Sequence, residues 1–231
     1  MISDVLLSLL QIIIVNLVLS GDNAIVIALA CRRLPPHLQK KAVFWGSIGA
    51  IVLRIILTFA AVWMLKIPFV QVIGGVLLIS IAVKLLAGEE EHASISGGSN
   101  MKEAMKTIIF ADLVMSLDNV IAVAGAANGN LVLVMIGLAI SIPLIVWGSQ
   151  LLMKLMNRFP FIVLAGAALL GYTAGEMIVG DAFIARFLDS VLPQAHVVVP
   201  IALAVIVVVL GKIKKQKAAK REEQSEASEA V

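Results

Sequence analysis

Seven long apolar segments constrain this chain more than any other feature of its sequence. They cover roughly residues 5–30, 42–65, 69–87, 105–127, 131–153, 161–179 and 195–211. A membrane-spanning helix needs about 20 predominantly apolar residues. Hydrophobic residues make up 61% of the 231 residues and charged residues 14%, whereas soluble domains are about 45–50% apolar and about 25% charged. A soluble fold of this size could not bury so much apolar surface. The sequence therefore predicts an all-α polytopic membrane protein with seven transmembrane helices. No signal-peptide pattern precedes the first segment, so we expect that segment to remain in the mature protein.

Lysine and arginine are distributed unequally among the segments that connect these spans. If seven spans alternate in direction, fourteen of the 18 basic residues fall on one side of the membrane. They are Arg32, Arg33, Lys40, Lys41, Lys102, Lys106, Lys154, Arg158, Lys212, Lys214, Lys215, Lys217, Lys220 and Arg221. Only Lys66 and Arg186 fall on the other side. Because short basic loops stay in the cytoplasm, we predict an external N-terminus and a cytoplasmic C-terminus. Residues 212–231 should form a charged cytoplasmic tail, disordered beyond a short helical stub.

A polar motif recurs inside two of the apolar spans. The sequence Ser-Gly-Asp-Asn at residues 20–23 returns as Ser-Leu-Asp-Asn at residues 116–119, at an offset of 96 residues. Three spans separate the two copies, so the second copy is inserted upside down relative to the first. This pattern is typical of inverted-repeat transporters, whose binding site lies near the middle of the membrane. We expect one transmembrane domain over residues 1–211, with three-helix repeats at about 5–87 and 105–179 and an extra helix at about 195–211.

Six ionisable residues fall inside the predicted spans and away from their first two residues, and each costs about 2.5–3.5 kcal/mol at the centre of a helix. They are Asp22, Arg54, Lys84, Asp112, Asp118 and Glu176. Asp22 and Asp118 hold equivalent places in the two repeats, which favours twin cation ligands over hydrogen-bonded packing residues. Arg54 either forms an ion pair with Asp22, Asp112 or Glu176, or acts directly in transport. Lys84 either reaches the membrane surface along its flexible stem or lines the pathway. Glu176 is a pathway residue or an ion-pair partner.

Further polar side chains flank these carboxylates along each helix. One stripe consists of Asn16, Ser20 and Asn23, and the other of Asp112, Ser116 and Asn119. Such stripes bind an ion or form hydrogen bonds between helices. Carboxylate, amide and hydroxyl oxygens suit Mg²⁺, Ca²⁺ or Mn²⁺ alike. The nucleotide-binding motif of ATP-driven pumps does not occur in the sequence. We therefore expect no enzyme, no catalytic residue, no tightly bound cofactor and no nucleic-acid partner. The expected partners are the lipid bilayer and the transported divalent ion, and nothing indicates an oligomer.

With these duplicated motifs at residues 16–28 and 112–124, the chain resembles the TerC family of integral membrane proteins, named for tellurium resistance. The resemblance covers about residues 1–210, and the length and the second motif are similar to the short YjbE-type branch. It implies a lysine-exporter-like architecture, a place in the bacterial inner membrane and the export of Mn²⁺. It also implies that Asp22, Asn23, Asp118 and Asn119 hold the metal, with Asp112 as an additional acid.

Two other functions stay open on the sequence alone. The chain could carry another small solute such as an amino acid, or serve as a non-transporting membrane factor in metal or tellurite stress. Export of a divalent cation against an inside-negative potential of about 100 mV costs roughly 4.6 kcal/mol. We therefore predict alternating access coupled to H⁺ antiport. The candidate proton carriers are Asp22, Asp112, Asp118 and Glu176.

Overall fold

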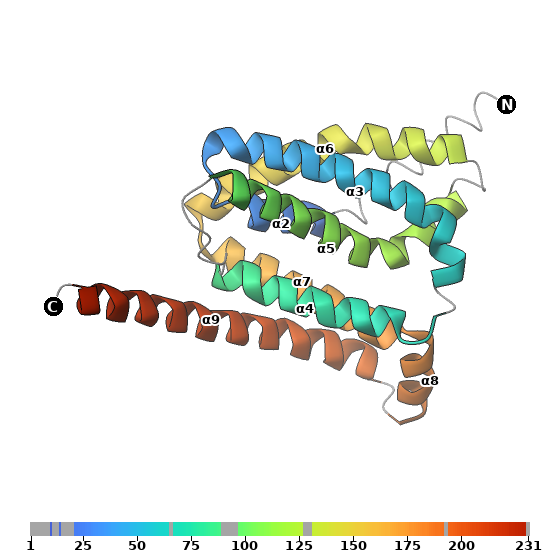
Figure 1. The fold of residues 1–231 in the computed structure, drawn as a ribbon. Coiled ribbons are helices and arrows are strands. Elements are labelled where there is room, and N and C mark those ends of the chain that lie inside the picture. Colours follow the sequence, from blue (N-terminus) through green and yellow to red (C-terminus); the bar gives the residue numbers. More distant parts are fainter. Residues whose placement is uncertain are drawn as a thin grey trace.

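The computed structural model describes residues 10, 14, 21–64, 67–88, 97–126, 131–191 and 194–229. In this part of the chain every element of regular structure is an α-helix. The eight helices are α2 (Gly21–Cys31), α3 (Pro36–Met64), α4 (Val70–Ala87), α5 (Gly97–Ala126), α6 (Leu131–Arg158), α7 (Phe161–Gly180), α8 (Ala182–Val191) and α9 (Ala195–Glu229). In Figure 1, α8 stands across one end of the bundle, and the other helices lie lengthwise in it. The expectation of an all-helical chain is confirmed.

Among the described residues, four helices are long and apolar enough to cross a membrane. They are α4, α6 over Met135–Arg158, α7, and α9 over Ala195–Lys220. Helix α2 is a shorter apolar helix, and most of the first predicted span lies outside the described residues. Helices α3 and α5 coincide with the second and fourth predicted spans. The chain is thus a polytopic membrane protein, and seven spans stay a prediction.

Local signals in the sequence set several helix ends. Pro36 occupies the first position of α3, where its missing N–H has no intrahelical partner to lose. Helix α4 is capped at its C-terminus by Gly88, whose φ of 75° is left-handed and whose N–H donates to the carbonyl of Lys84 at 2.9 Å. Before α8, the Asp181 carboxylate accepts a hydrogen bond from the Phe183 N–H at 3.1 Å. Asp181 therefore acts as the N-cap of a helix that turns sharply away from α7.

Three boundaries differ from the sequence-based predictions. Residues 182–191 form α8, although we expected an external loop, because ten residues are too few to register as a span. Helix α5 begins at Gly97, so the predicted loop at 88–101 is shorter than expected. The tail is also helical as far as Glu229, where we expected disorder. Its Lys, Arg, Gln, Glu and Ala residues favour helix, and they extend a helix that is already nucleated.

Small residues let the helices approach closely. A Cβ added at Gly175 of α7 would lie 2.4 Å from the Cα of Pro200 in α9, and one at Gly171 would lie 2.8 Å from the Leu203 carbonyl oxygen. A Cβ at Gly75 of α4 would lie 2.7 Å from the carbonyl oxygen of Ala174. This Gly-x-x-x-Gly pattern is typical of helix pairs in membranes. Helices α4, α7 and α9 therefore pack tightly against one another on one side of the bundle (Figure 1).

The remaining contacts define how the two predicted repeats interlock. Helix α3 packs along α5 and α2 packs against α6, while α2 also contacts α5 and α3 contacts α6. The starts of α3 and α5 and the ends of α6 and α9 lie at one end of the bundle (Figure 1). The described basic residues of the connecting turns and the tail gather there. We call this the basic end, and it carries Arg32, Arg33, Lys40, Lys41, Lys102, Lys106, Lys154, Arg158 and the lysines of α9.

Candidate functional site

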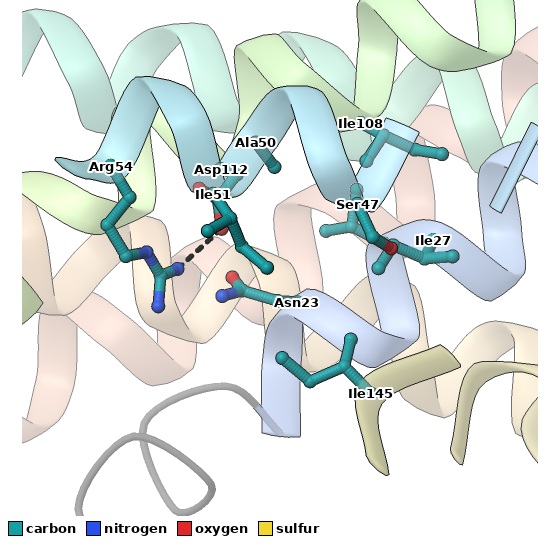
Figure 2. Close-up of a pocket in the computed structure, with 10 residues that line it drawn as sticks. Asn23, Ile27, Ser47, Ala50, Ile51, Arg54, Ile108, Asp112 and Ile145 are labelled. Carbon is teal, nitrogen blue, oxygen red and sulfur yellow. Dashed lines mark hydrogen bonds and ion pairs between the residues drawn. The ribbon is translucent and has the colours of Figure 1, made fainter. Parts of the chain in front are cut away.

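Helices α2, α3, α5 and α6 surround a small pocket, drawn in Figure 2. Its lining residues are Asn23, Val26, Ile27, Ser47, Ala50, Ile51, Arg54, Ile108, Asp112 and Ile145. The spacing of three, four and seven residues along α3 turns one face of that helix toward the pocket. The free volume is about 20 Å³, which admits about one water-sized object. The pocket is thus the size of a single ion or water molecule.

An ion pair lies at one end of this pocket (Figure 2). The Arg54 Nη2 donates to Asp112 Oδ1 at 2.5 Å, and its Nε donates to Ser116 Oγ at 2.9 Å. Ser116 Oγ in turn donates to Asp112 Oδ2 at 3.1 Å. Arg54 is 3% exposed and Asp112 is 8% exposed. Of the three partners predicted for Arg54, the structure selects Asp112, and the two charges compensate each other inside the bundle.

Two other polar side chains of the pocket lack partners among the described residues. Asn23 is 5% exposed, and neither its Oδ1 nor its Nδ2 forms a hydrogen bond. The buried Ser47 Oγ is also without a partner. Figure 2 shows the Asn23 amide directed toward the Arg54–Asp112 pair. A buried polar group left unpaired costs about 1–3 kcal/mol. Such groups are therefore rare unless a bound water or ion forms the missing interactions.

The structure brings some predicted site residues together and leaves others apart. Asn23, Arg54 and Asp112 line the pocket, and Ser116 is hydrogen-bonded to Arg54. Asp22 is half-buried next to it, and its carboxylate accepts the N–H of Asn23 at 2.8 Å. The other predicted residues do not line this pocket or are not described. Lys84 and Glu176 are exposed; Asn16 and Ser20 lie outside the described residues, as do the side chains of Asp118 and Asn119.

The predicted metal ligands are thus only partly placed. Within the described part of the chain, no three His, Cys, Asp or Glu residues converge on a point. The assignment of the metal to Asp22, Asn23, Asp118, Asn119 and Asp112 stays a prediction. Ser47 was missed by the sequence analysis. Its spacing of seven from Arg54 puts both on one face of α3, and this was the signal available for it.

Comparison with known proteins identifies the family. Residues 1–219 match the integral membrane protein TerC family. The chain belongs to this family. It is 46% identical to the membrane protein YjbE of Bacillus subtilis over 185 residues, which covers 80% of this chain and 85% of YjbE. The predicted family resemblance is therefore confirmed.

More distant relatives are longer than this TerC family member. YegH of Escherichia coli is 23% identical over 225 residues, covering 89% of this chain but 41% of YegH. The inner membrane protein YoaE of Escherichia coli is 23% identical over 228 residues, covering 90% of this chain and 43% of YoaE. The chain thus spans less than half the length of these two relatives. No solved structure matches the chain, and the three names specify no substrate.

Proposed function

We propose that this protein is a transporter that exports a divalent metal cation across a bacterial inner membrane, with Mn²⁺ as its substrate. The pocket between α2, α3, α5 and α6 carries this proposal. It offers the Asp112 carboxylate, together with the Asn23 amide oxygen and the Ser47 hydroxyl, which have no hydrogen-bond partner among the described residues. Oxygen donors of this kind suit Mn²⁺, Mg²⁺ and Ca²⁺. Mn²⁺ is named first because export of Mn²⁺ is the activity that the family resemblance implies.

The size of the pocket favours an ion over an amino acid. A cavity of about 20 Å³ holds about one water-sized object. Pockets for organic ligands are typically about 300–1,000 Å³. The buried amide and hydroxyl would replace part of the water shell that the ion leaves behind. An amino-acid transporter therefore receives less support from this geometry than an ion transporter does.

The helix contacts support two inverted repeats. If α2, α3 and α4 correspond to α5, α6 and α7, a two-fold rotation exchanges the α3–α5 pair with the α6–α2 pair. The same rotation maps the pairs α2–α5, α3–α6 and α4–α7 onto themselves. All of these pairs are in contact in the structure. In this arrangement the pocket is at the interface of the repeats, where alternating access places the substrate.

Arg54 and Asp112 suggest how the empty site stays neutral. While the site is empty, the guanidinium neutralises the Asp112 carboxylate. An entering cation competes with Arg54 for this carboxylate, so additional negative charge has to come from Asp22 or Asp118. Protons released from these acids on binding would supply the counter-flow that export requires. This is the H⁺ antiport that we propose.

Metal flux tests the proposal directly. Purified protein in liposomes should carry radioactive Mn²⁺, and an imposed pH gradient should change the rate. Excess unlabelled Mn²⁺ should compete, whereas amino acids should not. The Lys154→Gln variant serves as a control, because Lys154 is exposed at the basic end, away from the pocket. If liposomes with the protein are no more permeable to divalent cations than empty liposomes, the transporter proposal is wrong and a non-transporting role gains support.

A further inference from the structure

A second and larger cavity lies between α4 and α5. Its free volume is about 740 Å³, within the about 300–1,000 Å³ of typical ligand pockets. We call it the α4–α5 groove. It opens at the side of the bundle, where Lys84 of α4 and Phe110 of α5 are exposed. It does not share a lining residue with the small pocket, so it calls for a separate explanation.

The groove has two ends of different chemistry. Toward the basic end it is lined by Arg33, Lys84 and Lys106, and among the described residues Glu103 is the one acid that lines it. Deeper in the bundle its walls are apolar and include Leu53 of α3 and Leu113 of α5. Lys106 and Leu113 are seven residues apart on α5, which corresponds to about 10 Å along the helix. The cavity is therefore amphipathic along the length of the bundle.

The basic end of the groove carries positive charge that the described residues do not neutralise. Arg33 Nη1 donates to the carbonyl of Gly88 at 2.5 Å, and Arg32 Nη2 to that of Leu85 at 3.4 Å. In the part of the chain that the structure describes, no carboxylate forms an ion pair with Lys84 or Lys106. Burial lowers the pKa of the neighbouring Arg32, and the charge of Arg33 lowers it further. An anion at this end would relieve the repulsion.

We propose that the α4–α5 groove binds one anionic phospholipid from the membrane leaflet at the basic end. Lys84 and Lys106 hold the phosphate of the headgroup, and an acyl chain runs along Leu53 and Leu113. Basic pockets between membrane helices recognise anionic lipids in this way. The three basic residues would repel a divalent cation, so the groove is unsuited to be a branch of the metal pathway. A lipid phosphate also accounts for the position of Lys84 inside a predicted span.

The lipid would act on the helices that carry the small pocket. Leu53 precedes Arg54 on α3, and Leu113 follows Asp112 on α5. These two leucines pack together with Leu57 beside the ion pair. An acyl chain that fills the groove would therefore pack against the α3–α5 pair from the outside and stabilise it. Lipid binding is independent of the metal, so it can be measured whether or not the proposed transport function holds.

Native mass spectrometry of the full chain tests this proposal. The protein is released from detergent with equal amounts of phosphatidylglycerol and phosphatidylcholine. We expect one phosphatidylglycerol to be retained in preference to phosphatidylcholine. Lys84→Gln and Lys106→Gln should each lower the phosphatidylglycerol affinity about fivefold. This is the change in affinity that corresponds to the free energy contributed by one basic side chain near an anionic lipid. The control Lys154→Gln keeps the groove intact and should retain the preference.

Several results would overturn the proposal. Equal retention of the two lipids by the wild-type chain would show that the headgroup charge is not recognised. Displacement of the lipid by millimolar inorganic phosphate would indicate a site for free anions. If phosphatidylglycerol binds only after Glu89, Glu90 and Glu91 are replaced by glutamine, the acidic segment of the chain itself is the occupant. An equal loss in the Lys154→Gln control would indicate a general effect of surface charge.

Discussion

Arg54 and Asp112 neutralise each other's charge inside the bundle. Substitution of either residue alone should therefore lower the stability of the protein. Arg54→Gln leaves the Asp112 carboxylate buried without its cation. Loss of one partner of a buried pair typically lowers the free energy of unfolding by about 3–5 kcal/mol. We expect a matching fall in the thermal unfolding temperature of Arg54→Gln in detergent. Arg186→Gln, at an exposed position, should have little effect.

Double variants identify the partner of Arg54 independently of the structure. Arg54→Gln combined with Asp112→Asn removes both charges and should recover much of the lost stability. Arg54→Gln combined with Asp22→Asn or Glu176→Gln should not. If stability recovers with Asp22→Asn or Glu176→Gln, but not with Asp112→Asn, the Arg54–Asp112 ion pair is contradicted.

A substitution of Asn23 should affect transport and stability in opposite directions, so that the two roles can be separated. Its amide is buried without a partner among the described residues, so Asn23→Leu removes an unsatisfied group at similar volume. If Asn23 served packing alone, its replacement would lower the free energy of unfolding. For Asn23→Leu we expect instead a free energy of unfolding that is unchanged or about 1–3 kcal/mol higher. Mn²⁺ flux should fall steeply because an oxygen donor has been lost. Wild-type flux in a folded Asn23→Leu protein would exclude Asn23 from the site.

The candidate site could be read from the sequence only in part. Charged and amide residues stand out in an apolar span because burial makes them costly, so Asn23, Arg54 and Asp112 were found. The sequence left three partners open for Arg54, since the partner depends on which helices pack together. The pairing of α3 with α5 brings Asp112 to it. Ser47 is a common small residue that does not stand out in the sequence, and the fold is needed to show that it is buried with no hydrogen-bond partner among the described residues.

At the scale of elements, contact between α7 and α9 depends on two glycines. A Cβ at Gly175 would meet the backbone of Pro200 at 2.4 Å, and backbone cannot rotate away as a side chain can. Gly175→Ala should therefore force the two helices apart and cost about 1–3 kcal/mol of stability. Gly148→Ala in α6 is the matched control, because a Cβ there meets nothing within 4 Å. The control should be neutral or stabilising by up to about 1 kcal/mol. Equal unfolding temperatures for the two variants would contradict this close packing.

Element boundaries were predictable where a span is long and uniform, as in α4 and α7. The prediction was wrong for α8 and for the tail, and in both cases hydropathy was the misleading signal. Helix α8 is too short to appear as an apolar span, and the sequence analysis did not use its carboxylate cap, Asp181. The tail is charged, which suggested disorder, yet its residues are strong helix formers that follow directly on α9. A hydropathy pattern detects membrane spans and says little about helices outside them.

At the scale of the whole molecule, the gathering of basic residues at one end predicts the orientation in the membrane. Cytoplasmic loops carry the excess of lysine and arginine, so the basic end should face the cytoplasm. A reporter that is active only outside the cytoplasm should give no signal when fused after Val231. The same reporter fused after Gln194, beyond the sixth predicted span, should be active. Activity after Val231, or cleavage of residues 88–101 by external protease, would contradict this topology.

The proposed inverted repeat leads to a prediction that involves both halves of the molecule. Asp22 and Asp118 hold matching positions in the two copies of the sequence motif, and we propose that they share one divalent cation. Asp22→Asn and Asp118→Asn nearly preserve shape while each removes one negative charge, so both variants should fold and both should lose most Mn²⁺ flux. Because residues that act as a unit are not additive, the double variant should be little worse than either single variant. Full additivity would indicate two separate ions, one in each repeat. A correctly inserted Asp118→Asn protein that moves Mn²⁺ at the wild-type rate would refute the shared site.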